Sequence, residues 1–383
     1  MTSHEVEIIG NGSVFDGEQL LGDHGVVIEN GRIASIQPQR DLPRDAARYF
    51  DLGGGTLVPG FIDLQVNGGG GVLFNAAPDV DCIARIGAAH RRFGTTGFLP
   101  TLITDSFEVM GKAIDAVRQA MEQGVPGVLG IHLEGPFLNA ERRGVHDSRK
   151  FCALDRAGFE LVTSLAVGRT LLTLAPELSS PELIRDLVAA GVVVSAGHSA
   201  ATYDEARVAL DAGLTGFTHL YNAMPPLLSR DPGLVGAALT DESSWFGIIA
   251  DGHHVHPASL RVAVRAKQSG GALLVTDAMP CVGTNAKSFE WGGEIITAEN
   301  GRCVNAAGAL AGSDLDMLSA VKNAAQFTGL DFFEAVRMAS LYPARAMGLA
   351  DELGLVRPGY RASLVALDAQ RAITATWIDG QRA

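Results

Sequence analysis

Two histidines, His198 and His219, lie 219 − 198 = 21 residues apart, each at or near the end of a short apolar run that is typical of a β-strand. The segment between them, 202–212, carries a capping threonine and an apolar face, and Gly213 ends it, so it is expected to be a helix. A strand, a crossover helix and a second strand form a βαβ unit whose parallel strands end side by side. Neighbouring imidazoles suggest a metal site, although either histidine alone could be a hydrogen-bonded core residue.

Side chains of the metal-binding and acid–base types recur at the ends of six of the eight predicted strands. They are Asp63 and Gln65 on the first strand, His132 and Glu134 on the third, His198 on the fifth, His219 and Asn222 on the sixth, Asp251, His253 and His254 on the seventh, and Asp277 on the eighth. Nitrogen ligands with one carboxylate and an open position are typical of a catalytic zinc-type site, which lowers the pKa of its water to about 7. Asp277 is then the natural general base for that water.

These side chains would meet if the strands formed one barrel. Strands are predicted at 61–66, 97–101, 128–133, 171–174, 192–196, 216–220, 246–250 and 273–276, and helices at 80–93, 107–123, 157–167, 181–190, 202–212 and 257–268. This alternation predicts an α/β fold of the (β/α)8 TIM-barrel class, whose active site lies at the carboxyl ends of the strands. A doubly wound open sheet is the alternative, but the glycines at 68–71 lack the G-x-G-x-x-G spacing and are expected to form a flexible loop. Helices at 315–328 and 332–347 would complete the barrel.

Short strands are predicted near both ends of the chain. Asn11-Gly12 and Asn30-Gly31 separate alternating runs near the amino terminus, and 359–367 and 373–378 are strand-like near the other end. Neither end could bury a core alone. We therefore expect residues 1–58 and 351–383 to form one small β-sandwich domain, and residues 59–350 to form the barrel.

Composition narrows the possible partners. A formal net charge of −13 and a pI near 5.2 argue against nucleic acid and anionic membranes as ligands. There is no apolar run of the roughly 20 residues that a membrane helix needs, and the polar, acidic start is unlike a signal peptide. Four scattered cysteines without a C-x-x-C pair favour reduced thiols, and a cytoplasmic location is expected.

Taken together, six segments resemble the N-acetylglucosamine-6-phosphate deacetylase family of the amidohydrolase superfamily. They are PGFID at 59–63, HLEGP at 132–136, GHS at 197–199, THLYNAM at 218–224, DGHHV at 251–255 and VTDA at 275–278. The resemblance runs from Pro59 through the turn at 312–313 into the last strands. Whereas PGFID is common among amidohydrolases, HLEGP followed by THLYNAM is far more specific.

The resemblance implies a barrel with a small β domain and a metal-dependent reaction in amino-sugar catabolism. N-acetylglucosamine 6-phosphate would be hydrolysed to glucosamine 6-phosphate and acetate. One divalent metal, with zinc expected first and iron, cobalt or manganese as alternatives, would activate the attacking water. The roles implied are metal ligand for Glu134, His198 and His219, base and then acid for Asp277, carbonyl polarisation for His254, sugar contact for His146, and phosphate binding for Asn222, the Ala223 N–H and Arg230. The family also implies a homodimer in which the Arg230 loop reaches the neighbouring subunit.

The chain departs from the superfamily pattern at the end of the first strand. Many amidohydrolases carry H-x-H there and bind two metals, whereas this chain has Gln65-Val66-Asn67. Since an amide is a poor ligand beside imidazole, the second site should be absent or weak, with Gln65 as its remnant. Two alternatives stay open: an amidohydrolase acting on a cyclic amide or a purine, and a non-catalytic barrel that serves in assembly.

Overall fold

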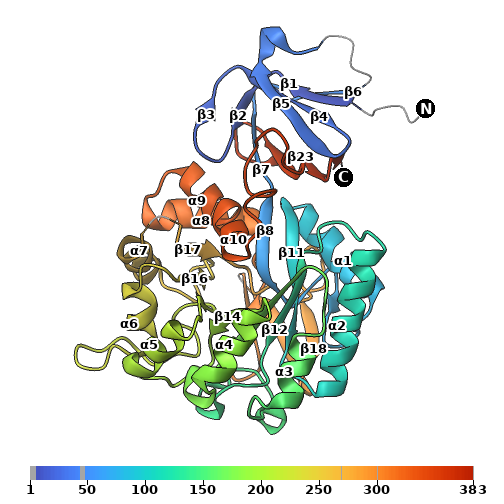
Figure 1. The fold of residues 1–383 in the computed structure, drawn as a ribbon. Helices are drawn as coiled ribbons and strands as arrows, with labels where there is room; N and C mark the ends of the chain where they lie inside the picture. The colour runs from blue at the N-terminus through green and yellow to red at the C-terminus, as the bar shows by residue number, and fades with distance from the viewer. Residues whose placement is uncertain (1–5, 44–47, 269, 300, 383) are drawn as a thin grey trace.

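The computed structural model describes residues 6–43, 48–268, 270–299 and 301–382, and an eight-stranded parallel sheet lies at its centre (Figure 1). Its strands, in spatial and chain order, are β8 (Phe61–Val66), β11 (Thr95–Ile103), β12 (Gly130–Glu134), β13 (Arg169–Leu174), β14 (Val193–Ala196), β15 (Gly216–Phe217), β16 (Trp245–Ile248) and β17 (Ala272–Leu274). The predicted TIM-type barrel is confirmed. Strands that are buried on both faces read as continuous apolar runs, which is why the sequence located them.

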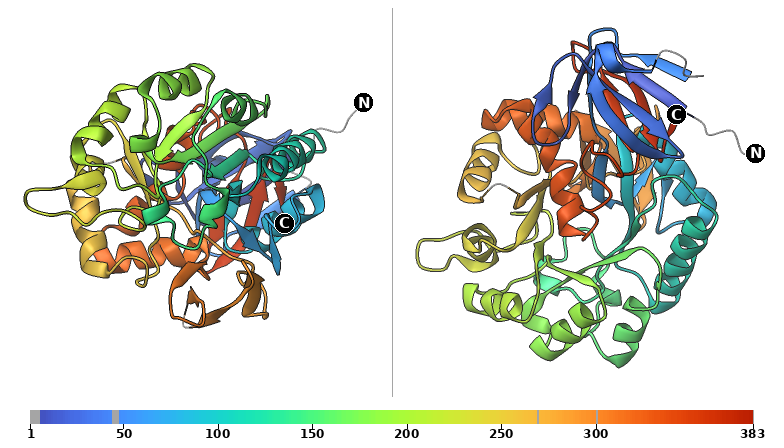
Figure 2. Two further views of the ribbon diagram at one scale, coloured as in Figure 1. Left: turned by 90° about the horizontal axis from the view of Figure 1, so that it is seen from below. Right: turned by 45° about the horizontal axis from the view of Figure 1, so that its top comes forward.

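Helices pack around the outside of the sheet (Figure 2). They are α1 (Val80–Arg91), α2 (Phe107–Glu122), α3 (Arg156–Val162), α4 (Pro181–Ala189), α5 (Tyr203–Asp211), α6 (Gly233–Thr240), α7 (Pro257–Ala266), α8 (Met317–Thr328), α9 (Phe332–Met338) and α10 (Leu341–Ala346). Thr202 caps α5 in a capping box with Glu205. Among the described residues, no helix is long and apolar enough to cross a membrane.

Two helical predictions need correction. Helix α6 escaped prediction because all of its residues from Gly233 to Leu239 are buried, so the segment has no polar face to reveal a helical period. The single helix expected over 332–347 is divided into α9 and α10. Pro343 has no N–H to donate to the carbonyl four residues earlier, which favours a break near Ala339.

The small domain consists of two sheets with strands from both chain ends. One has the order β5-β4-β1-β6, and the other β24-β23-β22-β7-β2-β3. Their bounds are β1 (Val6–Gly10), β2 (Ser13–Phe15), β3 (Leu20–Leu21), β4 (His24–Glu29), β5 (Arg32–Pro38), β6 (Arg48–Asp51), β7 (Thr56–Pro59), β22 (Leu364–Leu367), β23 (Ile373–Ile378) and β24 (Gln381–Arg382). Asn30-Gly31 forms the expected hairpin turn, with both residues at positive φ. The boundaries proposed at 58/59 and 350/351 stay predictions.

Side chains of the two small-domain sheets share one core, in which Trp377 is fully buried among residues of both. Strand β7 is paired on one side with β2 in parallel and on the other with β22 antiparallel. The amino-terminal strands are therefore held in the sheet by a strand from the far end of the chain.

A further four-stranded sheet lies at the rim of the barrel and was not predicted. After β17 the chain forms β18 (Ser288–Trp291), β19 (Glu294–Glu299), β20 (Arg302–Val304) and β21 (Leu310–Ser313), which we call the rim sheet (Figure 2). The flexible loop expected at 68–71 is also wrong: it contains β9 (Gly68–Gly69), paired with β10 (Val72–Leu73). The Gly68 N–H donates to Ala278 O at 2.9 Å, and a Cβ on Gly68 would lie 2.9 Å from the Pro280 nitrogen. These glycines permit close backbone packing.

The barrel closes where β8 meets β17, and a buried carboxylate holds this seam together. Asp63 Oδ2 accepts from the Thr276 hydroxyl at 2.6 Å, and its Oδ1 accepts from the Thr276 N–H at 3.2 Å. The Asp277 N–H donates to Gln65 O at 3.0 Å, and Val66 bridges to Ala278. Asp63 thus joins the first strand to the last one, immediately before Asp277.

Removing the seam carboxylate should weaken the fold. We expect Asp63→Ala to lower the free energy of unfolding by about 3 kcal/mol, because the Thr276 hydroxyl and N–H would be left buried without their acceptor. Asp63→Asn should lose less, since the amide oxygen can still accept from the N–H. Urea unfolding of the three proteins measures the difference, and a loss below about 0.5 kcal/mol for Asp63→Ala would contradict this role.

The same variants should show a pH dependence. Burial raises the pKa of Asp63 from 3.8 to about 7, although the hydrogen bonds from Thr276 and Gln65 oppose this shift. An acid with a raised folded-state pKa contributes stability that is present at low pH and lost as the pH rises through that pKa. The unfolding free energy of wild type relative to Asp63→Asn should therefore fall between pH 4 and 7. A constant difference would contradict the shift.

Candidate active site

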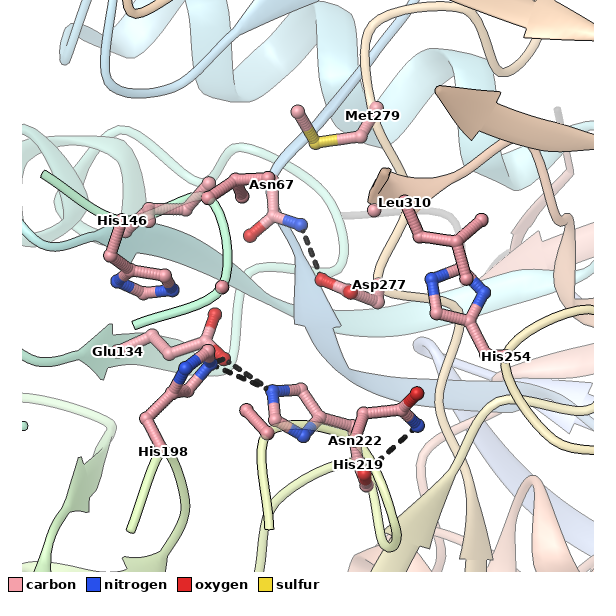
Figure 3. A pocket seen from close by; sticks show the side chains of 15 residues that line it. Asn67, Glu134, His146, His198, His219, Asn222, His254, Asp277, Met279 and Leu310 are labelled. Carbon is pink, nitrogen blue, oxygen red and sulfur yellow. Dashed lines mark hydrogen bonds and ion pairs between the residues drawn. The ribbon is translucent and has the colours of Figure 1, made fainter. Parts of the chain in front are cut away.

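A pocket with about 700 Å³ of empty space opens at the carboxyl ends of the barrel strands (Figure 3). It combines side chains from several strand ends with residues of the rim sheet. Its lining residues are Asn67, Ile103, Glu134, Gly144, Val145, His146, His198, His219, Asn222, Ala223, His254, Asp277, Met279, Leu310 and Gly312. The expected position of the active site, at this face of the barrel, agrees with the place of the pocket.

Three side chains converge on one point in this pocket. Glu134 Oε1 lies 3.2 Å from His198 Nε2 and 3.0 Å from His219 Nε2, and the two Nε2 atoms are 3.0 Å apart. All three side chains are nearly fully buried. Although burial opposes its charge, hydrogen bonds from both histidines hold the pKa of Glu134 well below its usual range. The site therefore gathers a buried carboxylate and two imidazoles.

This donor set fits a divalent metal. His198 Nδ1 lies 2.8 Å from the Arg142 carbonyl oxygen, which can only accept, so Nδ1 carries a proton. Nε2 would offer its lone pair to a metal that replaces the proton shared with Glu134. Ligand atoms bound tetrahedrally at about 2.0–2.1 Å would be separated by roughly 3.3 Å, close to the distances found. With three protein ligands, a fourth position is free for water or substrate.

The backbone is left-handed at two of these ligands and at Asp277. The φ angles are +48° at His198, +32° at His219 and +51° at Asp277. This conformation costs roughly 1–2 kcal/mol per residue for a side chain other than glycine. Such strain at the ends of three different strands is typical of a functional site.

Asp277 is held by two amides from the end of β8. Asn67 Nδ2 donates to Asp277 Oδ1 at 2.6 Å, and Gln65 Nε2 donates to the same oxygen at 3.1 Å and to Glu134 Oε1 at 3.2 Å. Burial and the Glu134 charge raise the pKa of Asp277 to about 6, while His219, His254 and Asn67 act in the opposite direction. A carboxylate with a pKa near neutrality is suited to accept and return a proton.

His254 lies on the other side of Asp277 (Figure 3), and Asp251 orients its ring. His254 Nδ1 lies 2.6 Å from Asp251 Oδ2, and both side chains are almost entirely buried. Burial opposes the charge of Asp251, but the bond with His254 lowers the pKa of its carboxyl below the usual value. Because Nδ1 is occupied, only Nε2 is available to a ligand. The sequence analysis placed Asp251 at the end of the seventh predicted strand but did not predict its contact with His254.

The structure brings most of the predicted site residues into the pocket. His146 is buried, with its ring 4.3 Å from the His198 ring and Nδ1 2.8 Å from Thr104 Oγ1. Asn222 and Ala223 line the pocket near His219. Arg230 does not reach it: this arginine is exposed on the loop between β15 and α6, which projects from the barrel (Figure 1).

Two polar residues expected at the rim lie deeper instead. Asp63 belongs to the seam. His132 Nε2 lies 2.8 Å from Thr173 Oγ1, and burial lowers the pKa of His132 to about 4, so this ring is a neutral part of the barrel core. Since side chains two residues apart in a strand point to the same side, His132 lies one layer below Glu134.

The sequence analysis missed the contribution of the rim sheet to the pocket. Leu310 and Gly312 line it, together with Met279 from the loop that follows Asp277. Gly312 has φ +64°, and a Cβ there would lie 2.9 Å from the Asp277 carbonyl oxygen. In the sequence, Gly312 is a weak indication that two backbone segments approach closely at this position. The apolar segment around Leu310 carries no indication that it lines a pocket.

Comparison with known proteins covers both parts of the chain. Residues 56–383 match the model of the amidohydrolase family, and residues 9–57 match that of the NagA composite domain. An N-acetylgalactosamine-6-phosphate deacetylase from Shewanella sp. (strain ANA-3) is 44% identical over 98% of this chain and 95% of its own. An N-acetylglucosamine-6-phosphate deacetylase from Homo sapiens is 38% identical, with 97% and 94% covered. The crystal structure of N-acetylglucosamine-6-phosphate deacetylase from Pasteurella multocida has a TM-score of 0.95 and 34% identity, with 99% of both chains covered.

Metal content tests the cluster directly. We expect about one divalent ion per chain in the wild type and less than a tenth of that in Glu134→Gln, because the amide removes the only anionic ligand. Inductively coupled plasma mass spectrometry of the purified proteins measures this. Glu141→Gln, at an exposed position outside the pocket, is the matched control and should retain its metal. Normal metal content in Glu134→Gln would contradict the ligand set.

Proposed function

Because this chain belongs to the amidohydrolase family, and relatives along its whole length are deacetylases of amino-sugar phosphates, we propose that it deacetylates N-acetylglucosamine 6-phosphate. The products are glucosamine 6-phosphate and acetate, and the reaction belongs to amino-sugar catabolism. The observation that carries the proposal is the convergence of Glu134, His198 and His219 beside Asp277 in one pocket. A barrel retained only for assembly would not need this complete set.

We assign Glu134, His198 and His219 to one divalent metal, and zinc is our first expectation. When bound, the metal would polarise the acetamide carbonyl and lower the pKa of a water molecule. Gln65 and Asn67 are engaged as donors to Asp277 and Glu134, which supports a single-metal site. This arrangement disfavours the cyclic-amide and purine alternatives, whose H-x-H pair is missing.

Asp277 would accept a proton from the attacking water and return it to the nitrogen of the leaving amine. The Asn67 amide fixes Oδ1, so Oδ2 is the oxygen left for the water. His254, whose Nδ1 is held by Asp251, would polarise the carbonyl oxygen through Nε2. Fixed donors aimed at the developing oxyanion usually contribute more to catalysis than any other single effect.

The phosphate would bind at Asn222 and the Ala223 N–H, and His146 would contact the sugar. We propose that Arg230 completes the phosphate site of a partner subunit in a homodimer. Two observations support this: Arg230 lies outside its own pocket, and its loop exposes Leu227 and Leu228 to about half of their surface. We also expect the enzyme to be cytoplasmic, since its four cysteines are free thiols.

N-acetylgalactosamine 6-phosphate is a second candidate substrate, favoured by the 44% identity to a deacetylase named for that sugar. The two sugars differ only in the configuration at C4, away from the acetamide and the phosphate. Steady-state kinetics with both substrates decides between them, and the preferred sugar should show the higher kcat/KM.

The function itself is tested by release of acetate from these substrates. We expect Asp277→Asn to lower kcat by about 10²–10⁴-fold, because the amide cannot accept the proton of the water. Its oxygen can still accept from Asn67 and Gln65, so metal content and folding should persist. Activity near the wild-type level would remove the base assignment. Failure of the wild type on both sugars, with metal bound, would overturn the proposed function.

The dimer proposal has its own test by complementation. Arg230→Ala should raise KM for the phosphorylated sugar far more than for unphosphorylated N-acetylglucosamine, whereas Arg185→Ala, on exposed α4, should do neither. A mixed dimer of one Arg230→Ala subunit and one Asp277→Asn subunit has one intact site. In that site Asp277 comes from the Arg230→Ala subunit and Arg230 comes from the Asp277→Asn subunit. Random mixing should therefore restore about a quarter of the wild-type rate. No recovery after subunit exchange would show that Arg230 does not act across the interface.

A further inference from the structure

Two of the four cysteines meet inside the protein. Cys281 Sγ and Cys303 Sγ are 3.3 Å apart, although the residues are 22 positions apart in the chain. Both are fully buried, at 1% and 0% exposure. An S–S bond is about 2.0 Å long, so the two sulfurs need to approach by only about 1.3 Å to be joined. The scattered spacing of the cysteines along the chain did not indicate this pair.

The pair connects two segments that both border the active site. Cys281 lies in the loop that follows Asp277, two residues after Met279, which lines the pocket. Cys303 lies in β20 of the rim sheet, whose last strand provides Leu310 and Gly312 to the same pocket. The two sulfurs pack in a small core with Leu73, Ile296 and Ala311, separate from the barrel core.

Among the described residues, the outer strands of the rim sheet contact the rest of the molecule mainly through this small core, against which the half-buried Phe289, Trp291 and Ala298 pack. In β18 and β19 most residues are exposed or only half-buried, and Ile296 is the one buried residue of the two strands. The Trp291 indole N–H reaches the Val145 carbonyl oxygen at 3.4 Å, and Lys287 pairs with Asp314 at 2.8 Å at the base of the sheet. A covalent link at Cys303 would therefore change how firmly the sheet is held.

We propose that Cys281 and Cys303 form a reversible disulfide that fastens the rim sheet to the loop that follows Asp277. With hydrogen peroxide as the oxidant, one thiol sulfur attacks a peroxide oxygen, and a sulfenic acid and one water result. The second sulfur displaces the hydroxyl of the sulfenic acid, which forms the S–S bond and releases a second water. The two sulfurs lose two electrons to the peroxide, and both thiol protons leave in the waters.

The surroundings of the pair determine how fast it would react. The hydrogen bond to Cys281, together with burial, raises the pKa of the Cys303 thiol above its usual value. Since the thiolate is the reactive form, oxidation at neutral pH should be slow and should follow opening of the rim sheet. The pair would then respond to sustained oxidation, and a dithiol such as dithiothreitol would reopen it.

Thiol mapping tests the proposal. The full-length, metal-loaded protein is treated with hydrogen peroxide, unfolded, alkylated with iodoacetamide and digested, and its peptides are identified by mass spectrometry. We expect a linked peptide pair containing Cys281 and Cys303, lost on reduction. The variant Cys82→Ser/Cys152→Ser, in which only the pair remains, should give the same link, whereas Cys303→Ser should give none. Free alkylation of both residues, or separate sulfinic acids on them, would overturn the proposal.

Hydrogen exchange tests the fastening. Amides of β18 and β19 should exchange at least several-fold more slowly in the oxidised Cys82→Ser/Cys152→Ser protein than in the same protein after reduction. Helix α2, on the barrel wall, is the internal reference and should not change. Equal exchange of the rim sheet in the oxidised and reduced forms, with the disulfide present, would show that the bond fastens nothing.

Discussion

The structure depends on bringing one carboxylate and two imidazoles from three separate strands to a single buried point. Glu134, His198 and His219 lie about 3 Å apart, where their lone pairs would repel one another without a shared cation or proton. The closed parallel barrel places the carboxyl ends of β12, β14 and β15 around one centre. The left-handed backbone at His198 and His219 shows the local cost of aiming both rings there.

The residues that close the barrel and the residues that support the pocket lie along the same strand, β8. Along β8, residues at every second position point inward, so Asp63, Gln65 and then Asn67 follow one another from the core to the mouth. Asp63 fastens the seam to Thr276, Gln65 contacts Glu134, and Asn67 holds Asp277. The amides of Gln65 and Asn67 both donate to Asp277 Oδ1. The same strand therefore supports both the fold and the reacting groups.

Much of this arrangement could be predicted from the sequence, because buried strands read as apolar runs and their ends carry polar residues. The prediction was wrong or incomplete where apolar and polar residues do not alternate in a recognisable pattern. Helix α6 is buried on all sides, and the rim sheet consists of short strands with little periodicity. His132 was placed at the rim because residue type alone does not reveal depth within the barrel. Arg230 was expected at the phosphate but lies exposed on the loop between β15 and α6, because residue type alone does not show how far such a loop lies from the pocket.

The chain ends carry a consequence for how the protein is made. Strand β7 lies between β2 and β22, and Trp377 of β23 fills the core beneath the amino-terminal sheet. On the ribosome, the first 58 residues emerge long before their partners at 364–378 are translated. The barrel strands are therefore made before the β domain can be completed, since that domain has to wait for residues 364–378. Until then, apolar strands with open edges would need protection by chaperones.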